Sequence, residues 1–445
     1  MTLRASRWRS MPTMATPARA ARPLLAWLAG SLAWLAVAGS LPVAGTAAAA
    51  DVPAHAGVAA ASDPAVRIAA VGAGKGVLAS TRVAADAHGG SSVVWRSSAG
   101  DRDYGQVLGK PLRIVLTTGE AGVVVGNGIN SDNGKAVLFV HDIGDGTVLA
   151  KLDTGAGSAS QRNGLLSVRG WDFDGDGSVD FIYAGDLLGN LWKFDLSDRR
   201  PEQWHVANRG QPLFVASDAD GKRQPITGGL SLALDPIDFS TWVFFGTGRL
   251  LSADDRATTD TQSLYGLIDA GVAITGRSAL MQRKIVSLGI NSGKIVRGFE
   301  PAGERAAEKS GWYIDLLAPP GGLAEGERIV GTVAVIGRVL LSTSSIAGDE
   351  RKQAGGRGFV NALDAFTGAS VDTALFDVNG NGVFSDDTIA GSAIGSVDLG
   401  VGMPGVPTLI AGQLLVHGSL GRVARIAIIN PATVGRISWR EVIAD

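Results

Sequence analysis

Four aspartates stand close together in the stretch DFDGDGSVD, which runs from residue 172 to residue 180. Counted from the first of them, they occupy positions 1, 3, 5 and 9, and a glycine occupies position 6. This is the ligand spacing of a calcium loop of the EF-hand kind, in which alternate side chains turn inward and the glycine lets the chain reverse. The pattern predicts a calcium (Ca²⁺) site formed by Asp172, Asp174, Asp176, the main-chain carbonyl of Ser178, and Asp180.

The loop departs from an EF-hand at its end. Position 12 is Tyr183 instead of the bidentate glutamate, and the residues that follow are typical of a strand, with no flanking helix. This fits a shorter calcium loop inserted between two β-strands, in which Asp180 closes the site. An acidic surface turn without a metal is the alternative, although carboxylates gathered without a cation would repel one another.

A second stretch, DVNGNGVFSDD at residues 377–387, has a related spacing with fewer charges. We expect it to bind calcium more weakly, and an Asn/Gly-rich turn without metal remains an equal alternative. Its candidate ligands are Asp377, Asn379, Asn381, Val383, Ser385, Asp386 and Asp387.

The elements that must position these loops are short strands. The chain has 445 residues, of which 62 are glycine and only 18% are charged. From about Asp103 onward, short apolar runs recur, and each is bounded by Gly, Asn or Asp. This composition and punctuation predict an all-β fold of strands joined by tight turns.

A strand–Asp–Gly-turn–strand–Asp unit is repeated along the chain. The clearest copies are VLFVHDIGDGTVLAKLDTG from residue 137 and FIYAGDLLGNLWKFDLS from residue 181, and FVNALDAFTGASV from residue 359 is a third, degraded copy. The aspartate would cap the turn through nearby backbone N–H groups, and the glycine would supply the positive φ. Repeated hairpins of this kind predict the blades of a β-propeller, with a β-sandwich as the alternative.

The first fifty residues differ from the rest. They carry five arginines and no acidic residue, then an apolar run at residues 24–38 and a small-residue stretch that ends at Ala50. This predicts a signal peptide at residues 1–50, cleaved after Ala50, because the run is shorter than the about 20 apolar residues that span a membrane. An uncleaved anchor is the alternative. Residues 51–102 are predicted to be an Ala/Gly/Ser-rich linker or poorly ordered segment, and residues 103–445 the propeller.

Several function classes are disfavoured. A net charge of −2 argues against nucleic-acid binding. The chain has no cysteine, which excludes thiol catalysis and zinc–cysteine sites. The five histidines form no metal-ligand spacing, no G-x-S-x-G elbow is present, and His141 at a strand end is interpreted as structural. Quinone-dependent propeller enzymes also use calcium, but they need a dense set of tryptophans and often paired cysteines. We therefore predict no catalytic activity.

The sequence resembles the C-terminal propeller of the PilY family, which comprises tip-associated assembly proteins and adhesins of type IV pili. The matching stretches include VVVGNGINSDNGKAVLFVHD, DFDGDGSVDFIYAGDLLGNLWKFDLS, RQPITGG, FFGTGRLL, TQSLYGLID, GWYIDL, NALDAFTG and FDVNGNGVFS. They follow the family's order over roughly residues 104–443. No D-x-S-x-S motif is found, so the von Willebrand factor A-like region of many members is expected to be absent.

The resemblance implies a non-catalytic propeller with quinoprotein-like blades, the earliest of which are missing or replaced by residues 51–100. It also implies calcium at the first loop, and a role in pilus biogenesis, in control of extension and retraction (twitching motility), and in adhesion. Expected partners are minor pilins or other pilus components and a host or abiotic surface. The protein would be exported to the periplasm, pilus tip or outer cell surface. A secreted glycan- or protein-binding module unrelated to pili is the alternative.

Overall fold

The computed structural model describes residues 66–70, 78–83, 91–96, 100–301, 303, 308–348 and 355–429. Residues 1–50, predicted as the signal peptide, lie outside the described residues. In the described ranges, helix is limited to a four-residue element, α1 (Ala207–Gly210), and four short 3₁₀ turns, so none of the helices is long and apolar enough to cross a membrane. Strands make up the rest of the regular structure, and the prediction of an all-β fold is confirmed.

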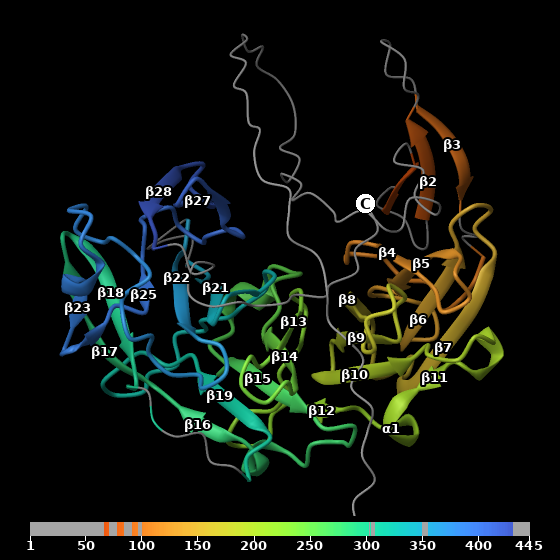
Figure 1. Cartoon of the computed structure of the whole chain (residues 1–445), viewed down its shortest axis with the longest axis horizontal. Coiled ribbons are helices and arrows are strands. Elements are labelled where there is room, and N and C mark those ends of the chain that lie inside the picture. The colour runs from red at the N-terminus through yellow and green to blue at the C-terminus, as the bar shows by residue number, and fades with distance from the viewer. Residues whose placement is uncertain are drawn as a thin grey trace, which may run out of the picture. The chain divides into compact units, whose positions relative to one another are not determined.

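The strands form six sheets of three or more strands, numbered here in chain order (Figure 1). Sheet I contains β1 (Val66–Ala70), β2 (Leu78–Val83) and β3 (Ser91–Arg96). Sheet II contains β4 (Leu112–Val115), β5 (Ala121–Gly126), β6 (Lys135–Asp142) and β7 (Val148–Gly157). Sheet III contains β8 (Leu165–Trp171), β9 (Phe181–Asp186), β10 (Asn190–Asp195), β11 (His205–Val206) and β12 (Phe214–Val215).

Sheet IV contains β13 (Ser231–Leu234), β14 (Thr241–Gly246), β15 (Ser263–Asp269), β19 (Gly311–Asp315) and β16 (Met281–Arg283), in that spatial order. Sheet V runs in the order β17 (Ile285–Asn291), β18 (Lys294–Phe299), β25 (Ser396–Val397), β22 (Arg357–Asp364), β21 (Val339–Ile346) and β20 (Ala334–Ile336). Sheet VI contains β26 (Thr408–Ile410), β27 (Gln413–His417) and β28 (Val423–Ala427), and a separate pair joins β23 (Thr388–Ile389) to β24 (Ser392–Ala393).

The core consists of apolar layers between consecutive sheets. Strand β14, TWVFFG, is buried along its whole length. Because successive side chains of a strand point to opposite faces, Trp242 and Phe244 pack toward sheet V, and Val243 and Phe245 pack toward sheet III. Similar layers lie between sheets II and III and between sheets V and VI. Burial on both faces explains why these strands are nearly continuous apolar runs instead of alternating ones.

One hairpin crosses from sheet IV to sheet V. Strands β17 and β18 follow β16 in the chain and precede β19, and both β16 and β19 belong to sheet IV. The hairpin itself pairs with β25 through Val296 and Arg297 of β18, which places it in sheet V. The chain thus leaves one sheet, contributes two strands to the next, and returns.

Strands β1–β3 lie within residues 51–102, so the expectation of a linker does not hold for them. Their sequences mix Ala and Ser with Val and Arg, which gives a weak hydrophobic pattern. The Trp95 side chain of β3 is buried with Tyr104 and Phe139, and its Nε1 donates to the carbonyl oxygen of Ile143 at 2.8 Å. The other predicted domain limits stay predictions.

The Asp–Gly turns have the predicted capping contacts. In the turn between β9 and β10, Asp186 Oδ1 accepts hydrogen bonds from the N–H groups of Leu188 (2.9 Å) and Asn190 (2.8 Å), and Gly189 has a φ of 79°. Asp142 and Asp364 accept from N–H groups two and three residues further along in the corresponding turns. Each turn therefore joins its strands through a side chain that satisfies backbone donors.

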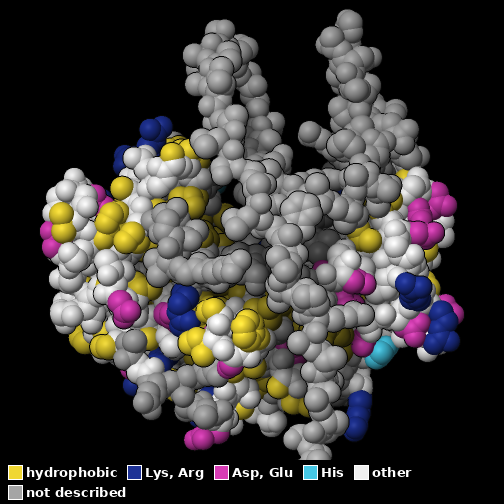
Figure 2. All heavy atoms as spheres, in the orientation of Figure 1, with side chains coloured by type: hydrophobic (Ala, Val, Ile, Leu, Met, Phe, Trp, Pro, Cys, Tyr) yellow, Lys and Arg dark blue, Asp and Glu magenta, His cyan; other side chains and the backbone are white. Residues whose placement is uncertain are grey.

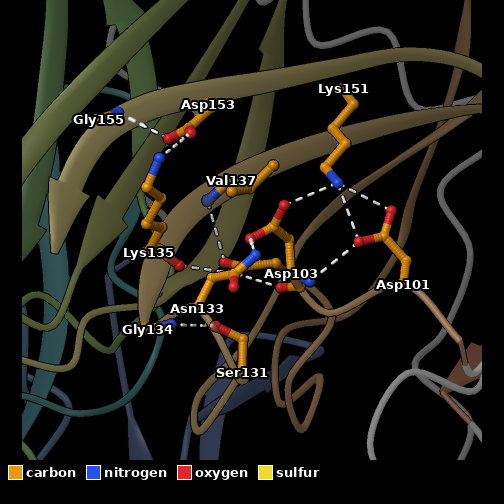
Figure 3. A network of polar contacts seen from close by, with 11 residues as sticks. Asp101, Asp103, Ser131, Asn133, Gly134, Lys135, Val137, Lys151, Asp153 and Gly155 are labelled. Atoms are coloured by element: carbon orange, nitrogen blue, oxygen red, sulfur yellow. Dashed lines mark hydrogen bonds and ion pairs between the residues drawn. The ribbon is translucent and has the colours of Figure 1, made fainter. Parts of the chain in front are cut away.

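A polar network holds the segment before sheet II against it (Figure 3). Lys151 of β7 contacts Asp103 at 2.7 Å and Asp101 at 2.9 Å, and Asn133 donates to Asp103 at 2.6 Å. Burial alone would raise the pKa of Asp103, but Lys151 and the hydrogen bond from Asn133 outweigh it and hold this pKa below its ordinary value. The buried Asn127 amide adds four bonds to backbone groups of neighbouring segments, which explains the polar GNG stretch between two apolar strands.

His141 is buried in sheet II. Its Nδ1 donates to the carbonyl oxygen of Gly146 at 3.0 Å, and its Nε2 then accepts from the Tyr104 hydroxyl. Burial lowers the pKa of His141, which favours the neutral ring, in which Nε2 is the acceptor.

We therefore predict that His141 makes the fold less stable in mild acid. Because its pKa is lowered in the folded state, the unfolded chain binds more protons once the pH falls through its ordinary value of about 6.5. The free energy of unfolding should decrease below that pH, with a slope from this group of less than about 1.4 kcal/mol per pH unit. Urea unfolding between pH 5 and 7.5 measures it. The slope should flatten in His141→Gln but not in the exposed-site control His205→Gln; equal slopes in His141→Gln and the native protein would contradict the assignment.

Candidate metal centre

The loop DFDGDGSVD connects two paired strands of sheet III. Strand β8 ends at Trp171 and β9 begins at Phe181, and these two residues are register partners. The Asp180 N–H donates to the Trp171 carbonyl oxygen at 3.0 Å, and the Val179 N–H donates to Val115 at 2.9 Å. Val179 is fully buried. Both ends of the loop are thus fixed by the ladder and the core, so the loop can only project outward.

Three of the predicted carboxylates come together at this loop. Asp172, Asp174 and Asp176 each have a carboxylate oxygen within 4.8 Å of those of the other two. Asp172 is buried, and the other two are exposed. The positive φ values of Gly175 (77°) and Gly177 (96°) turn the chain so that alternate residues point to one side. The structure therefore brings positions 1, 3 and 5 of the predicted site together.

The loop is organised by carboxylates that accept backbone hydrogen bonds. Asp172 accepts from the N–H groups of Gly175 (2.5 Å) and Gly177 (3.1 Å). Asp176 accepts from both the N–H and the hydroxyl of Ser178, at 2.7 and 2.6 Å. These hydrogen bonds lower the pKa of Asp176. Ser178, predicted to supply its carbonyl, is thus seen to hold a neighbouring carboxylate through its side chain.

Asp180 lies beneath the loop and outside the group of three. It is buried, and its Oδ2 accepts from the Phe173 N–H at 2.7 Å. Burial raises the pKa of the Asp180 carboxyl, and the nearby negative charges of Asp174 and Asp172 act in the same direction. The loop therefore concentrates negative charge, and its donor set of carboxylate oxygens is the kind that could hold a hard divalent cation.

The loop also contacts a charged cluster shared by two sheets. Phe173 is 68% exposed, and its ring lies edge-on to Phe181, with centroids 5.9 Å apart. The Lys193 ammonium stands 3.9 Å from the centre of the Phe181 ring and 2.7 Å from Asp269 of sheet IV. The Tyr183 hydroxyl donates to the same carboxylate at 2.5 Å. Contacts between side chains thus run from Phe173 of the loop through Phe181 and Lys193 to Asp269 of sheet IV.

The second predicted loop lies between Phe376 and β23 and is mostly exposed. Asp377, Asn379 and Asn381 lie at its turn, and Val383 precedes a 3₁₀ turn at residues 384–386. Ser385 and Asp386 belong to that turn, whereas Asp387 is fully buried beneath the loop. By spacing, Ser385 stands at position 9, which Asp180 occupies in the first loop, whereas the structure places Asp387 beneath the second loop. The only sequence signal for the role of Asp387 was the acidic pair Asp386–Asp387 just before β23.

The comparisons with known proteins agree with one another. The family model described as the PilY1 β-propeller domain matches residues 88–285. A Type IV pilus biogenesis factor PilY1 homolog of Xylella fastidiosa is 36% identical over 330 residues, covering 71% of this chain and 22% of the relative. The crystal structure of the Pseudomonas aeruginosa PilY1 C-terminal domain aligns with a TM-score of 0.71 at 28% identity, covering 82% of this chain and 80% of that one. The described sheets form a PilY1-type C-terminal β-propeller.

The predicted family and fold are thereby confirmed. The full-length Type IV pilus biogenesis factor PilY1 of Pseudomonas aeruginosa is 30% identical over 386 residues, covering 76% of this chain and 32% of that protein. The chain spans between 22% and 32% of the length of these two curated relatives. The match therefore concerns the PilY1 propeller, and the first loop lies within the residues that the family model matches.

Proposed function

We propose that this PilY1-type propeller is a non-catalytic calcium-binding module that acts in type IV pilus biogenesis, in the control of pilus extension and retraction, and in adhesion to surfaces. The observation that carries the pilus role is the structural match to the PilY1 C-terminal domain, joined by relatives named as type IV pilus biogenesis factors. Such a role requires an exported protein, in the periplasm, at the pilus tip or at the cell surface.

Calcium at the first loop is supported by the donor set. Asp172, Asp174 and Asp176 supply carboxylate oxygens within reach of one ion, and the buried Asp180 closes the loop from below. When bound, calcium supplies two positive charges that offset the mutual repulsion of these carboxylates. The backbone hydrogen bonds to Asp172 and Asp176 hold these two carboxylates in place beforehand.

A docking role is supported by what the loop presents to solvent. Phe173 is an exposed aromatic residue in the middle of the acidic turn, and the position of its ring depends on the conformation of the turn. On the face seen in Figure 2, acidic and basic side chains are scattered among apolar ones. We propose that a fixed loop offers Phe173 to minor pilins or other pilus components, or to a host or abiotic surface.

The test is the variant Asp172→Ala/Asp180→Ala. Calorimetric titration of the purified protein should show calcium affinity at this loop lowered by at least about 100-fold, because two carboxylates are lost. The same variant, restored to a strain that lacks the gene, should fail to recover normal piliation and twitching, whereas Asp220→Ala, in an exposed turn, should recover both.

Two results would contradict the proposal in different ways. Unchanged calcium affinity in the double variant would leave the first loop as an acidic turn. Normal pili and motility in the strain that lacks the gene, together with retention of the protein on glycans, would favour a secreted binding module unrelated to pili.

A further inference from the structure

Residues 377–387 repeat the internal contacts of the first loop. Asp377 accepts from the N–H groups of Gly380 (2.7 Å) and Gly382 (3.0 Å), as Asp172 accepts from the corresponding glycines. Gly380 and Gly382 both have a φ of 79°, again in the left-handed region. The two loops therefore share one backbone course, although they lie in different parts of the propeller and have different sequences.

The third and fifth positions are asparagines with a fixed orientation. Asn379 Oδ1 accepts from the Asn381 N–H at 2.9 Å, and Asn381 Oδ1 accepts from the Val383 N–H at 2.7 Å. Both Nδ2 groups donate to Asp386, at 3.0 and 2.7 Å. Because an amide can present either its oxygen or its nitrogen, these contacts decide which one turns inward, and they keep both oxygens on the loop side.

The decisive observation is the side chain of Asp387. This residue is fully buried, and its Oδ1 accepts from the Asn379 N–H at 3.3 Å, so the carboxylate faces the loop from below, as Asp180 does in the first loop. Its buried Oδ2 has no hydrogen-bond partner among the described residues. Burying a carboxylate oxygen without a donor or a cation is costly, which indicates that a ligand is needed at this point.

We propose that residues 377–387 form a second calcium site, with oxygen ligands from Asp377, Asn379, Asn381 and Asp387. The 3₁₀ turn Phe384–Asp386 moves the closing acid from position 9 to position 11. Asp386 acts as a positioning residue, because it holds the two amides and leaves their oxygens available. With two neutral ligands, this site binds calcium more weakly than the first.

The site lies where three segments meet. The Asp377 N–H donates to Ala427 of β28 at 3.0 Å, and the Ile394 N–H, just after β24, donates to the Asp387 carbonyl oxygen at 3.0 Å. Lys294 of β18 donates to the Val378 carbonyl oxygen at 2.8 Å. A cation held between Asp377 and Asp387 therefore ties the segment that pairs with β28 of sheet VI to the β23–β24 pair, next to the contact with Lys294 of sheet V.

The test compares single variants by calorimetric titration of the chelator-treated protein with calcium chloride. The native protein should bind two ions with different affinities. Asp387→Asn, which keeps the shape of the side chain, should weaken the lower-affinity site by about 10- to 100-fold and leave the other unchanged. Asp180→Asn should do the reverse, and the exposed-site control Asp372→Asn should change neither. One binding event that Asp387→Asn leaves unaltered would overturn the proposal.

Further measurements separate this site from the first and from a folding defect. If Asp387→Asn loses calcium binding and Asp180→Asn keeps all of it, the result would support the second site and contradict the first. If Asp387→Asn does not melt cooperatively, the half-buried Asp377→Asn replaces it, with the same expected loss. Hydrogen exchange should show β26–β28 slowed by calcium in the native protein and not in these variants; calcium-independent exchange there would contradict the link to sheet VI.

Discussion

Replacing Glu327 with alanine is expected to lower the free energy of unfolding by about 3–5 kcal/mol, because it leaves a buried guanidinium without its counter-ion. Glu327 and Arg297 are each 2% exposed, and they form two parallel hydrogen bonds of 2.7 and 2.8 Å. Burial alone would raise the pKa of Glu327, but the charge and hydrogen bonds of Arg297 hold it below its ordinary value. The carboxylate is therefore ionised and needed as such.

Neighbouring side chains of sheet V also contact the pair. Ser344 donates to its Oε1 at 2.5 Å, Asn361 accepts from Arg297 at 3.1 Å, and the guanidinium lies 3.6 Å from the centre of the Phe359 ring. Chemical denaturation followed by circular dichroism measures the loss. The exposed pair Arg200–Asp198 is the control, since water screens this pair and Asp198→Ala should leave the stability nearly unchanged.

A double variant tests the reason for the effect as well as its size. Arg297→Met/Glu327→Leu removes both charges and should recover most of the stability lost in Glu327→Ala, because no buried charge is then left unpaired. If Glu327→Ala melts like the native protein, or if the double variant is no more stable than the single one, the buried ion pair does not have the role assigned to it.

Replacing Trp312 with alanine is expected to lower the free energy of unfolding by about 3–5 kcal/mol, because it leaves a cavity in the core. Trp312 of β19 is 1% exposed in the core shared by sheets IV and V, and its Nε1 donates to the Ala365 carbonyl oxygen at 2.7 Å. A methyl group added to Gly266 or Gly368 would come within 2.6 and 2.4 Å of the indole. The indole thus packs directly against the backbone at Gly266 and Gly368, where any side chain would clash with it.

Thermal and urea unfolding of Trp312→Ala measure this loss. Ile237→Ala is the matched control, because Ile237 is 77% exposed and its truncation removes little buried area. Trp312→Phe should lie between the two, since the phenyl ring refills part of the space but leaves the Ala365 carbonyl oxygen without its donor. A Trp312→Ala protein as stable as the control would mean that the neighbouring sheet collapses onto the vacated space.

The sequence predicted best where one local rule decides the structure. The spacing of Asp172, Asp174 and Asp176 determines a turn whatever surrounds it, and the Asp–Gly hairpins follow from capping contacts a few residues apart. The prediction was less complete where distant segments decide. That Asp387 instead of Ser385 lies beneath the second loop depends on a short 3₁₀ turn and on β24, whose contacts are not contained in a ligand spacing.

The sequence also did not predict which segments far apart in the chain lie together. Strands β17 and β18 pair with each other as a hairpin, and the sequence of such a hairpin does not say which sheet it joins. Glu327 and Arg297 are 30 residues apart in sequence, and two isolated charges in a chain with 42 acidic residues give no signal of being buried together. Strands β1–β3 were missed because Ala- and Ser-rich strands have weak hydrophobic contrast.

The hairpin β17–β18 has a mechanical consequence. A tension applied along the chain across sheets IV and V cannot peel one sheet away and leave the other intact, because the segment between β16 and β19 is itself paired with β25 in sheet V. Extending the chain through this whole region breaks pairings in both sheets, those of β16 and β19 in sheet IV and that of β18 with β25 in sheet V. Sheets IV and V are thus connected by strand pairing as well as by side-chain packing, because one stretch of chain contributes strands to both.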